Sequence, residues 1–421
     1  MRDTPALHAD PRRALLLDLY AAACSAVNGR RAVRAALATA GHAPGQDWSL
    51  IAVGKAAASM TLGALDVLGP LVRRGLVISR PGHLDPELAE WPALRCLTGD
   101  HPRPGAASLA AGRELQSFAA GCAAGQPVLV LVSGGASSLA EALLPGVGAA
   151  DLATVSDWAL ASGAPIGVVN AVRSRLSALK GGRLAAALGH TEARALLISD
   201  VPGDDPAVIG SGLAAAGAPR PLPPLPAAIA ALLARAPPAP PGAVLPAVVV
   251  GSLDAALAAV VRIAEARGLS ARRLDPPAAG AVTDEASRFA HELAFTTEDL
   301  LVWGGETTVE LPAEPGRGGR NQQFALLTAS LIAGHGDLVV LAAGTDGSDG
   351  NTDDAGAIVD SGTLTRGAAS GLEPALALAA ANAAPFLQAA GDLLHTGPTG
   401  TNVGDIVIGL RRGPEPAADA E

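Results

Sequence analysis

Residues 128–138 read VLVLVSGGASS, five aliphatic residues followed at once by a turn rich in glycine and serine. The aliphatic run shows no alternation of polar and apolar residues, which is typical of a strand covered on both faces, as in a parallel sheet between helices. Ser133, Gly134, Gly135 and Ser137 place glycines and hydroxyls where that strand ends, so the backbone can approach phosphate oxygens closely. This stretch predicts an α/β fold with a ligand-binding turn; a merely tight turn is the alternative.

Similar apolar runs recur along the chain, each ended by a turn with Gly or Asp and followed by an Ala- and Leu-rich stretch of helical composition. The predicted strands are 50–53, 128–132, 195–199, 248–250, 300–303, 338–342 and 406–410. Ten of the 33 prolines lie between Pro219 and Pro246, which indicates a semi-rigid connector. We expect an α/β protein of two domains, each a mostly parallel sheet between helices. The predicted parts are an N-terminal Rossmann-like domain (1–218), a Pro-rich linker (219–246), a C-terminal domain (247–412) and a tail (413–421).

Composition excludes several classes of partner. The chain has 421 residues, a formal net charge of -10 and only 2% aromatic residues, whereas nucleic-acid binding needs a basic face and stacking aromatics. No apolar run approaches the length of a membrane span, so no membrane is expected as a partner. The N-terminus lacks the features of a secretion signal, and three widely spaced cysteines fit reduced thiols. A cytoplasmic location is therefore expected.

The basic residues are distributed unevenly, because 28 are Arg and only two are Lys. Lys55 and Lys180 both lie next to glycine, and a Lys ammonium is a compact point charge that Arg does not replace. Gly54 and Lys55 follow the predicted strand 50–53, where the start of a helix would aim backbone N–H groups and the ammonium at one point and stabilise an anion. The alternative for Lys55 is an exposed side chain in an ordinary turn.

Arg173 and Lys180 are seven residues apart, about two turns of a helix, so a helix through this segment would place both on one face. With Asn170 they form a candidate site for a carboxylate or a phosphate. A solvated basic face is the alternative.

Acidic residues gather in two turns that follow predicted strands. Asp200, Asp204 and Asp205 follow strand 195–199, and Asp346 and Asp353 lie in the turn after strand 338–342. Clustered carboxylates repel one another unless they bind a cation, and their hard oxygens suit Mg²⁺. We predict Asp200 or Asp204 as the catalytic base and Asp205, Asp346 and Asp353 as metal ligands. An Asp-rich surface turn is the alternative.

The second half of the chain contains a glycine-flanked basic loop, residues 316–323, that enters a predicted helix. Arg320 supplies a bidentate cation there, which predicts an oxyanion site, with Asn321 beside it and Glu306 in the turn after strand 300–303. The turn 396–402, TGPTGTN, adds glycines and hydroxyls near the C-terminus.

Taken together, these motifs resemble those of the class II glycerate 2-kinases, and the second domain resembles the MOFRL domain of that family. The resemblance runs in order from about residue 15 to 410. It rests on Gly54-Lys55-Ala56, Gly99-Asp100-His101-Pro102, Ser133-Gly134-Gly135, Lys180-Gly181-Gly182, residues 199–205 (SDVPGDD), residues 304–308 (GGETT), residues 318–322 (GGRNQ), residues 344–347 (GTDG) and residues 396–402.

The resemblance implies transfer of the ATP γ-phosphoryl group, with Mg²⁺, to the 2-hydroxyl of D-glycerate, giving 2-phosphoglycerate. It also implies an active site in a cleft between two α/β domains, with Lys55 and Arg320 as the active-site cations. The partners would be a small hydroxy acid and a nucleotide, and a homo-oligomer is compatible with the sequence.

The chain departs from the family pattern in several loops, at Ala136, at Ser174-Arg175, at Leu213-Ala214 and at Gln323. These departures keep a related small hydroxy acid open as the substrate, and they would also fit a catalytically inactive sugar-acid sensor. An NAD(P)-dependent hydroxypyruvate reductase is a further alternative, but it would need a Gly-x-Gly-x-x-Gly turn after a strand, which this chain lacks.

Overall fold

The computed structural model describes residues 10–40, 45–162, 166–218, 221–237 and 242–411; the predicted tail 413–421 lies outside them, as do residues 219–220 and 238–241 of the predicted linker. The described chain forms two compact units. The N-terminal unit comprises residues 28–251 and 400–402, and the C-terminal unit comprises residues up to 27, 252–399 and those from 403 onward. The predicted division into two α/β domains is therefore present, but its boundaries differ.

The N-terminal unit is built on a six-stranded sheet of order β3-β2-β1-β4-β5-β6 in which every pair is parallel. The strands are β1 (Trp48–Val53), β2 (Val72–Ser79), β3 (Leu94–Thr98), β4 (Pro127–Val132), β5 (Glu192–Ile198) and β6 (Ala247–Gly251). The sheet grows in one direction from β1 to β3 and in the other from β4 to β6. The switch point therefore lies between β1 and β4, where ligands bind in sheets of this kind.

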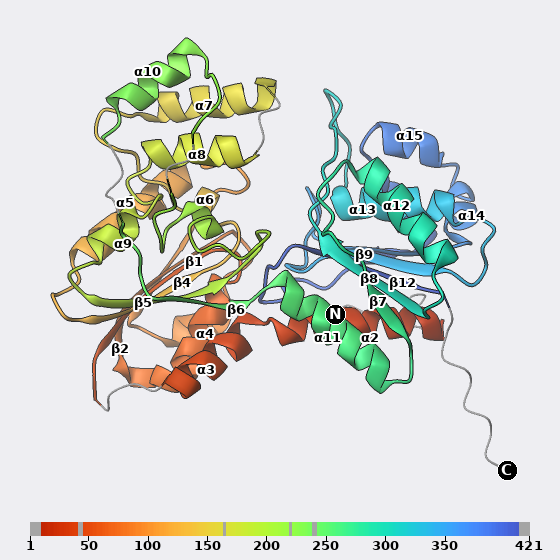
Figure 1. Cartoon of the computed structure of the whole chain (residues 1–421), viewed down its shortest axis with the longest axis horizontal. Coiled ribbons are helices and arrows are strands. Elements are labelled where there is room, and N and C mark those ends of the chain that lie inside the picture. Colours follow the sequence, from red (N-terminus) through yellow and green to blue (C-terminus); the bar gives the residue numbers. More distant parts are fainter. Residues whose placement is uncertain (1–9, 41–44, 163–165, 219–220, 238–241, 412–421) are drawn as a thin grey trace. The chain divides into compact units, whose positions relative to one another are not determined.

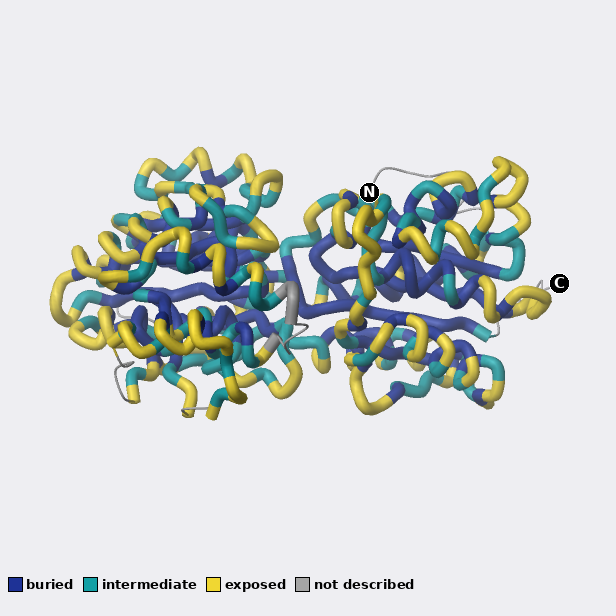
Figure 2. Tube along the Cα trace, turned by 90° about the horizontal axis from the view of Figure 1, so that it is seen from above, coloured by how far each residue is buried: buried dark blue, intermediate teal, exposed yellow. Residues whose placement is uncertain are grey.

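Helices cover both faces of this sheet (Figure 1), and its central strands β1 and β4 are buried throughout (Figure 2). One face carries α3 (Gly29–Ala40) and α4 (Ala57–Leu68), and the other carries α5 (Ala106–Ala120), α6 (Ala136–Leu139) and α9 (Arg183–Ala187). Helices α7 (Ala149–Ser162), α8 (Ile166–Leu176) and α10 (Ala227–Arg235) pack together around a small core of their own. Short 3-10 helices lie at η1 (Gly69–Leu71), η2 (Pro86–Glu90) and η3 (Ile209–Ser211).

The predicted linker is part of the N-terminal unit. Its helix α10 packs against α7 and α8, and the strand that follows it, β6, pairs in parallel with β5. A parallel pair needs a long crossover connection, and the predicted linker is the second half of the one that runs from β5 to β6. The Pro-rich composition therefore marks a crossover inside one sheet, and the chain leaves this unit only after Gly251.

The C-terminal unit contains a mixed six-stranded sheet of order β11-β10-β9-β12-β8-β7. Its strands are β7 (Ala271–Arg273), β8 (Leu300–Gly305), β9 (Val339–Gly344), β10 (Gly356–Asp360), β11 (Leu393–Leu394) and β12 (Asp405–Leu410). Within the described residues only β7 and β8 pair in parallel, and β12 lies antiparallel between β8 and β9. The expectation of a mostly parallel second sheet was wrong. Its strands are buried on both faces, which removes the alternation of polar and apolar residues whatever the strand direction.

Helix α2 (Pro11–Ala26) and α11 (Leu253–Ala266) cover one face of this second sheet (Figure 1). The other face carries α12 (Val282–Phe295), α13 (Arg320–Leu331), α14 (Thr363–Ala368), α15 (Pro374–Ala379) and α16 (Ala383–Ala390). The core on that side includes Trp303, which stacks on Phe289 with ring centroids 6.0 Å apart. None of the helices in the described ranges is both long enough and apolar enough to cross a bilayer.

Helix α2 belongs to the C-terminal unit although the sequence prediction placed it in the first domain. Its Arg13 is buried and forms ion pairs with Asp360 and Asp392, which lie in and beyond β10. Buried charges require such partners, so the contact ties the start of the chain to the second sheet. Local sequence does not reveal a pairing between residues so far apart.

Candidate functional site

The turns that follow β1 and β4 are locked together at the switch point. Ser133 donates its backbone N–H to the carbonyl of Val53 at 3.0 Å, and Lys55 donates its backbone N–H to the carbonyl of Gly134 at 2.9 Å. Gly54 has a φ of 135°, and a Cβ at this residue would lie 2.1 Å from the Ser133 Oγ. Glycine is therefore required there both by the backbone conformation and by the close approach of the second turn.

The backbone groups at the start of α4 are already bound within the protein. The N–H of Ala56 donates to the Ser133 Oγ at 3.0 Å, and the Ser133 side chain is fully buried. The sequence predicted that these N–H groups would face an anion, and for Lys55 and Ala56 the structure shows otherwise. Ser133 and Gly54 hold the two turns together, and the side chain of Lys55 is half-buried.

Side chains from several strand ends converge on Gly134 and Gly135. Around Gly135, a Cβ would lie 3.2 Å from the Cγ of Lys55 and 3.5 Å from the Nε2 of His101. Around Gly134, a Cβ would lie 2.0 Å from the Oδ2 of Asp200 and 2.0 Å from the Nδ2 of Asn402. We call Lys55, His101, Asp200 and Asn402, with the two glycines, the strand-end cluster. Lys55, His101 and Asp200 follow β1, β3 and β5, so the cluster lies where carboxyl ends of parallel strands meet.

Asn402 reaches this cluster from the end of the chain. Its Nδ2 donates to the Oδ2 of Asp200 at 3.2 Å. Its segment is held at the start of α3, where the N–H of Gly29 donates to the carbonyl of Gly400 at 2.9 Å. The sequence prediction quoted the motifs that contain His101 and Asn402 without assigning these residues to a site. Both residues could have been found from the sequence as polar residues close to the glycines of their motifs.

The other two carboxylates after β5 have local roles. Asp205 is exposed, and its Oδ1 accepts the N–H of Ala207 at 2.9 Å. Asp204 is half-buried with a φ of 53°, an uncommon conformation for a residue with a side chain. Of the three, Asp200 is the one that the contacts around Gly134 bring into the strand-end cluster.

Lys180 lies in an internal ion pair. Helix α8 ends at Leu176, so Arg173 and Lys180 do not share a helix. The prediction that both lie on one helical face was wrong. The Nζ of Lys180 contacts Oε2 of Glu141, with side-chain exposures of 0% and 1%. Burial lowers the pKa of Lys180 to about 8, although Glu141 opposes this shift. Burial also lowers the pKa of Arg173, although the attraction of Glu141 acts in the opposite direction. The sequence analysis did not identify Glu141.

The remaining predicted residues of this region lie near Arg173. Asn170 is half-buried in α8, one turn before Arg173. Arg173 donates through Nη2 to the carbonyl of Ser137 at 3.4 Å, and the hydroxyl of Ser211 donates to the Ser137 Oγ at 2.8 Å. These contacts connect α8 and the turn after β5 to the turn after β4.

In the C-terminal unit, Arg320 begins α13 and is held by two carboxylates. Its Nε donates to Oδ2 of Asp405 at 2.5 Å, and its Nη2 donates to Oε1 of Glu306 at 2.8 Å. Burial lowers the pKa of Arg320, but the attraction of Asp405 and Glu306 outweighs it and the net shift is upward. The sequence predicted the cation and Glu306 but missed Asp405, the first residue of β12.

Asn321 faces a buried carboxylate. Asp349 accepts the backbone N–H of Asn321 at 3.1 Å, its side-chain Nδ2 at 3.2 Å, and the backbone N–H of Gln322 at 2.8 Å. Burial raises the pKa of Asp349 to about 7, while the backbone hydrogen bonds from Gln322 and Asn321 act in the opposite direction. Both Asn321 and Asp349 are thus engaged inside the unit.

The two carboxylates predicted as metal ligands in the C-terminal unit differ in their exposure and contacts. Asp346 is buried, and its Oδ1 accepts the N–H of Ser348 at 2.9 Å and its hydroxyl at 3.1 Å, whereas Asp353 is exposed. Over the described ranges, no group of three or more His, Cys, Asp or Glu residues is arranged to hold a metal ion.

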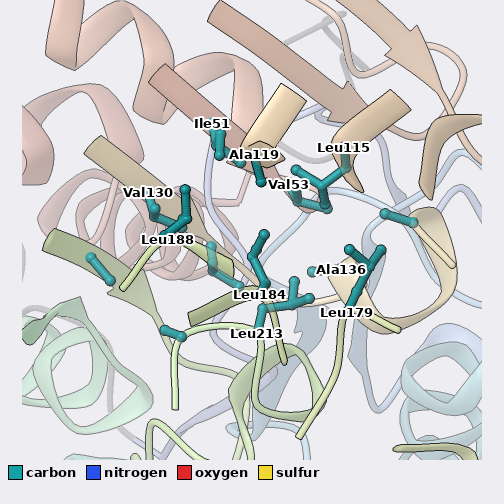
Figure 3. Packing of buried hydrophobic residues seen from close by; sticks show 14 of the residues in the cluster. Ile51, Val53, Leu115, Ala119, Val130, Ala136, Leu179, Leu184, Leu188 and Leu213 are labelled. Carbon is teal, nitrogen blue, oxygen red and sulfur yellow. The ribbon is translucent and has the colours of Figure 1, made fainter. Parts of the chain in front are cut away.

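Several departures from the family pattern are buried. Ala136, Leu213 and Ala214 belong to the main core of the N-terminal unit, where Figure 3 shows Ala136 and Leu213 among the packed side chains. Gln323 is buried in α13 and donates through Nε2 to the carbonyl of Leu378 at 2.9 Å. A carboxylate cannot make that donation. These four departures therefore lie at internal positions.

The chain is similar to known proteins over most of its length. The model described as "Domain of unknown function (DUF4147)" matches residues 15–221, and that of the MOFRL family matches residues 299–405. The D-glycerate 2-kinase of Thermotoga maritima is 34% identical over 379 residues, which cover 86% of this chain and 90% of that protein. A putative hydroxypyruvate reductase of Agrobacterium vitis is 36% identical over 380 residues, covering 85% and 97%. The crystal structure of glycerate kinase from Thermotoga maritima superposes with a TM-score of 0.78 at 30% identity, covering 94% of this chain and 98% of that chain.

Proposed function

Because the chain belongs to the class II glycerate 2-kinase family, we propose that it phosphorylates D-glycerate at the 2-hydroxyl with ATP, giving 2-phosphoglycerate and ADP. The observation that carries this proposal is the strand-end cluster, which gathers the side chains of Lys55, His101 and Asp200 around Gly134 and Gly135. Its location at the switch point of a parallel sheet is where such folds bind nucleotides and small ligands.

The proposed reaction needs positioning and charge stabilisation more than covalent help from the protein. The 2-hydroxyl oxygen forms a bond to the γ-phosphorus, the bond from that phosphorus to the bridging oxygen breaks, and ADP leaves with the electron pair. Lys55 supplies a compact positive charge for phosphoryl oxygens, and Arg320 supplies a planar guanidinium that suits phosphate or carboxylate. These roles rest on the geometry of each residue in its own unit.

Asp200 is the favoured base for the hydroxyl proton. It lies against Gly134, and the hydrogen bond from Asn402 to Oδ2 holds its carboxylate in one orientation. Asp204 was an equal candidate from the sequence, but the contacts that define the cluster involve Asp200. A positioned carboxylate is the group that accepts the nucleophile's proton in phosphoryl transfer.

We treat Mg²⁺ as part of the nucleotide substrate. Bound to ATP, the ion neutralises phosphate oxygens, and it commonly keeps several waters while using only one or two protein carboxylates. The hydrogen bonds that Asp205 and Asp346 accept from residues near them in the sequence are compatible with an ion held mainly by phosphates. Thermal melts test this: ATP with Mg²⁺ at a hundredfold excess over Kd stabilises the fold by about 2.7 kcal/mol, and ATP without Mg²⁺ stabilises it less. Equal increases in Tm with and without Mg²⁺ would contradict the proposal that the ion binds together with ATP.

Hydroxypyruvate reduction is disfavoured by the turn after β1. A dinucleotide pyrophosphate binds to backbone N–H groups of a Gly-x-Gly-x-x-Gly turn. Here the N–H groups of Lys55 and Ala56 are bound to Gly134 and Ser133. A related small hydroxy acid as substrate, a sensor without catalysis, a cytoplasmic location and a homo-oligomeric state stay predictions from the sequence.

The deciding experiment supplies the purified protein with Mg²⁺-ATP and a set of small hydroxy acids, and measures ADP release. We expect release with D-glycerate and a product that phosphorus NMR identifies as 2-phosphoglycerate. Release only with another hydroxy acid would change the substrate, and NADH oxidation by hydroxypyruvate without ADP release would replace the kinase by the reductase. Absence of both activities, with ligand binding retained, would support the sensor.

The same assay tests Arg320. Arg320→Ala removes charge stabilisation in the transition state and should lower kcat/KM by about 10²-fold or more. Circular dichroism checks that the fold remains. A lost fold would make Arg320 a structural residue.

A further inference from the structure

Helix α13 begins without a capping side chain from its own sequence. Its N-cap residue is Gly319, which has no side chain, although the first N–H groups of any helix need acceptors from outside it. The acceptor comes from the loop after β9, where the Asp349 carboxylate receives the N–H groups of Asn321 and Gln322. The helix is thus capped by a residue distant in sequence.

The fit between Asp349 and the start of the helix is close. Asp349 is 2% exposed, and a Cβ at Gly319 would lie 2.3 Å from its Cγ, so this approach depends on the bare glycine. Asn351 holds the preceding loop as well, because its Oδ1 accepts the N–H of Gly318 at 2.9 Å and its Nδ2 donates to the carbonyl of Gly316 at 3.1 Å. The loop after β9 therefore fixes residues 316–322.

Arg320 lies at the centre of this arrangement, as the first residue of α13 between Gly319 and Asn321. Its guanidinium is oriented by Asp405 and Glu306, as described above. Its backbone lies between the two points that Asp349 contacts, Gly319 and the N–H of Asn321. Two carboxylates thus hold the guanidinium of Arg320, and a third, Asp349, holds the backbone that follows it.

We propose that Asp349 is a positioning residue for phosphoryl transfer, which fixes the backbone of Arg320 by capping α13. The proposal rests on the function proposed above for Arg320, and Asp349 itself is not assigned any contact with substrate. A displacement of about 1 Å in a positioned group lowers turnover by about 10²-fold, so a loose first turn of α13 would impair catalysis without removing any charged group at its surface.

The kinetic test compares Asp349→Ala with a matched cap variant. Asp349→Ala should lower kcat by about 10²-fold while KM for ATP changes little, and Tm should fall by about 2–4 °C, as for the loss of one helix cap. Ser252→Ala is the control, because the Ser252 Oγ caps α11 in the same unit by accepting the N–H of Ala255 at 3.3 Å. It should lose similar stability and keep kcat. Equal kcat losses in both variants would overturn the proposal.

A double variant separates positioning from an independent role. If Asp349 acts through Arg320, adding Asp349→Ala to Arg320→Ala should cause no further loss of kcat. Multiplied losses would show that Asp349 acts by another route. Gly319→Ala approaches the same contact from the other side, because its Cβ displaces the carboxylate, and it should reproduce the kinetic loss of Asp349→Ala.

Hydrogen exchange makes the test independent of glycerate kinase activity. In the wild type the amides of Asn321 and Gln322 should be protected, and in Asp349→Asn, which keeps the size but only one acceptor oxygen, at least one should exchange faster while α12 is unchanged. Unaltered exchange in that variant would overturn the capping step even if Asp349→Ala fails to fold. A wild type that releases no ADP would refute the proposed function, whereas the exchange result would still decide the capping.

Discussion

The two lysines of this chain lie beside glycines in similar turns, yet their surroundings differ completely. Lys55 is half-buried beside Gly135 and His101 at the switch point of the first sheet. Lys180 has no exposed side-chain surface and contacts Glu141, with Arg173 adding a repulsive charge. Two physical causes for the resistance to replacement by Arg follow: for Lys55, the point charge that the proposed function requires, and for Lys180, a closed internal space that admits a slim ammonium.

The largest effect is expected from breaking the internal pair. Lys180→Met leaves the Glu141 carboxylate buried without its counterion, which should lower the free energy of unfolding by about 3–5 kcal/mol. Adding Glu141→Gln removes the uncompensated charge and should restore most of that loss. Urea denaturation of the three proteins measures it. An unchanged free energy of unfolding in Lys180→Met would mean that the ion pair does not stabilise the fold. The predicted ligand-binding role of Lys180 would then be favoured.

A larger cation at the same place should cost less. Lys180→Arg keeps the charge but overfills a closed site, which should lower the free energy of unfolding by about 1–3 kcal/mol. Turnover per folded molecule should change much less than at Lys55. If Lys180→Arg lowers turnover without lowering stability, the assignment of a structural role to Lys180 and a catalytic role to Lys55 would be wrong.

Lys55→Arg is the mirror experiment. A planar guanidinium does not reproduce a point-charge ammonium, so kcat should fall by at least about tenfold, equivalent to about 1.4 kcal/mol in the barrier. The urea midpoint should stay close to that of the wild type, since the side chain is only half-buried. Unchanged turnover would remove Lys55 from the site.

The smallest effect is a dependence of stability on pH. Burial holds the pKa of Lys180 at about 8, below its ordinary 10.5, so between these values the unfolded chain keeps a proton that the folded protein has released. The unfolded state then binds more protons, and the contribution of Lys180 to stability rises with pH across this window. Burial raises the pKa of Tyr20 and Cys24, which act in the opposite direction. Subtracting the free energy of unfolding of the Glu141→Gln/Lys180→Met variant from that of the wild type cancels the contributions of Tyr20 and Cys24. A difference that does not change with pH would contradict the lowered pKa of Lys180.

The strand-end residues show how far pattern reading reaches. Gly54-Lys55 and Ser133-Gly134-Gly135 were identified because glycine and polar residues directly after a buried strand are visible in one dimension. Their meeting follows from the parallel sheet, since carboxyl ends of parallel strands share one edge. What the pattern did not show is the structural role of Ser133, whose Oγ accepts the N–H of Ala56 at the start of the neighbouring helix.

Errors arose where one composition fits two architectures. Proline richness between 219 and 246 suits a linker between domains and a crossover inside one sheet equally well, and only the pairing of β6 with β5 decides between them. Likewise, Arg173 and Lys180 have helical spacing, but α8 ends at Leu176. The direction of the strands in the second sheet could not be predicted either. Burial on both faces removes the alternation of polar and apolar residues that often marks antiparallel strands.

The sequence by itself determined the α/β class, the positions of the main strands and the glycine turns, because these depend on local periodicity and on residue chemistry. It also proposed Lys55, Arg320 and either Asp200 or Asp204 as site residues. Only the tertiary structure decided which charges are paired. Glu141 with Lys180, Asp349 with the start of α13, and Asn402 with Asp200 each join residues far apart in the chain. A hydrogen bond or ion pair requires contact within a few ångströms, and long-range contact is a property of the folded chain that no local pattern encodes.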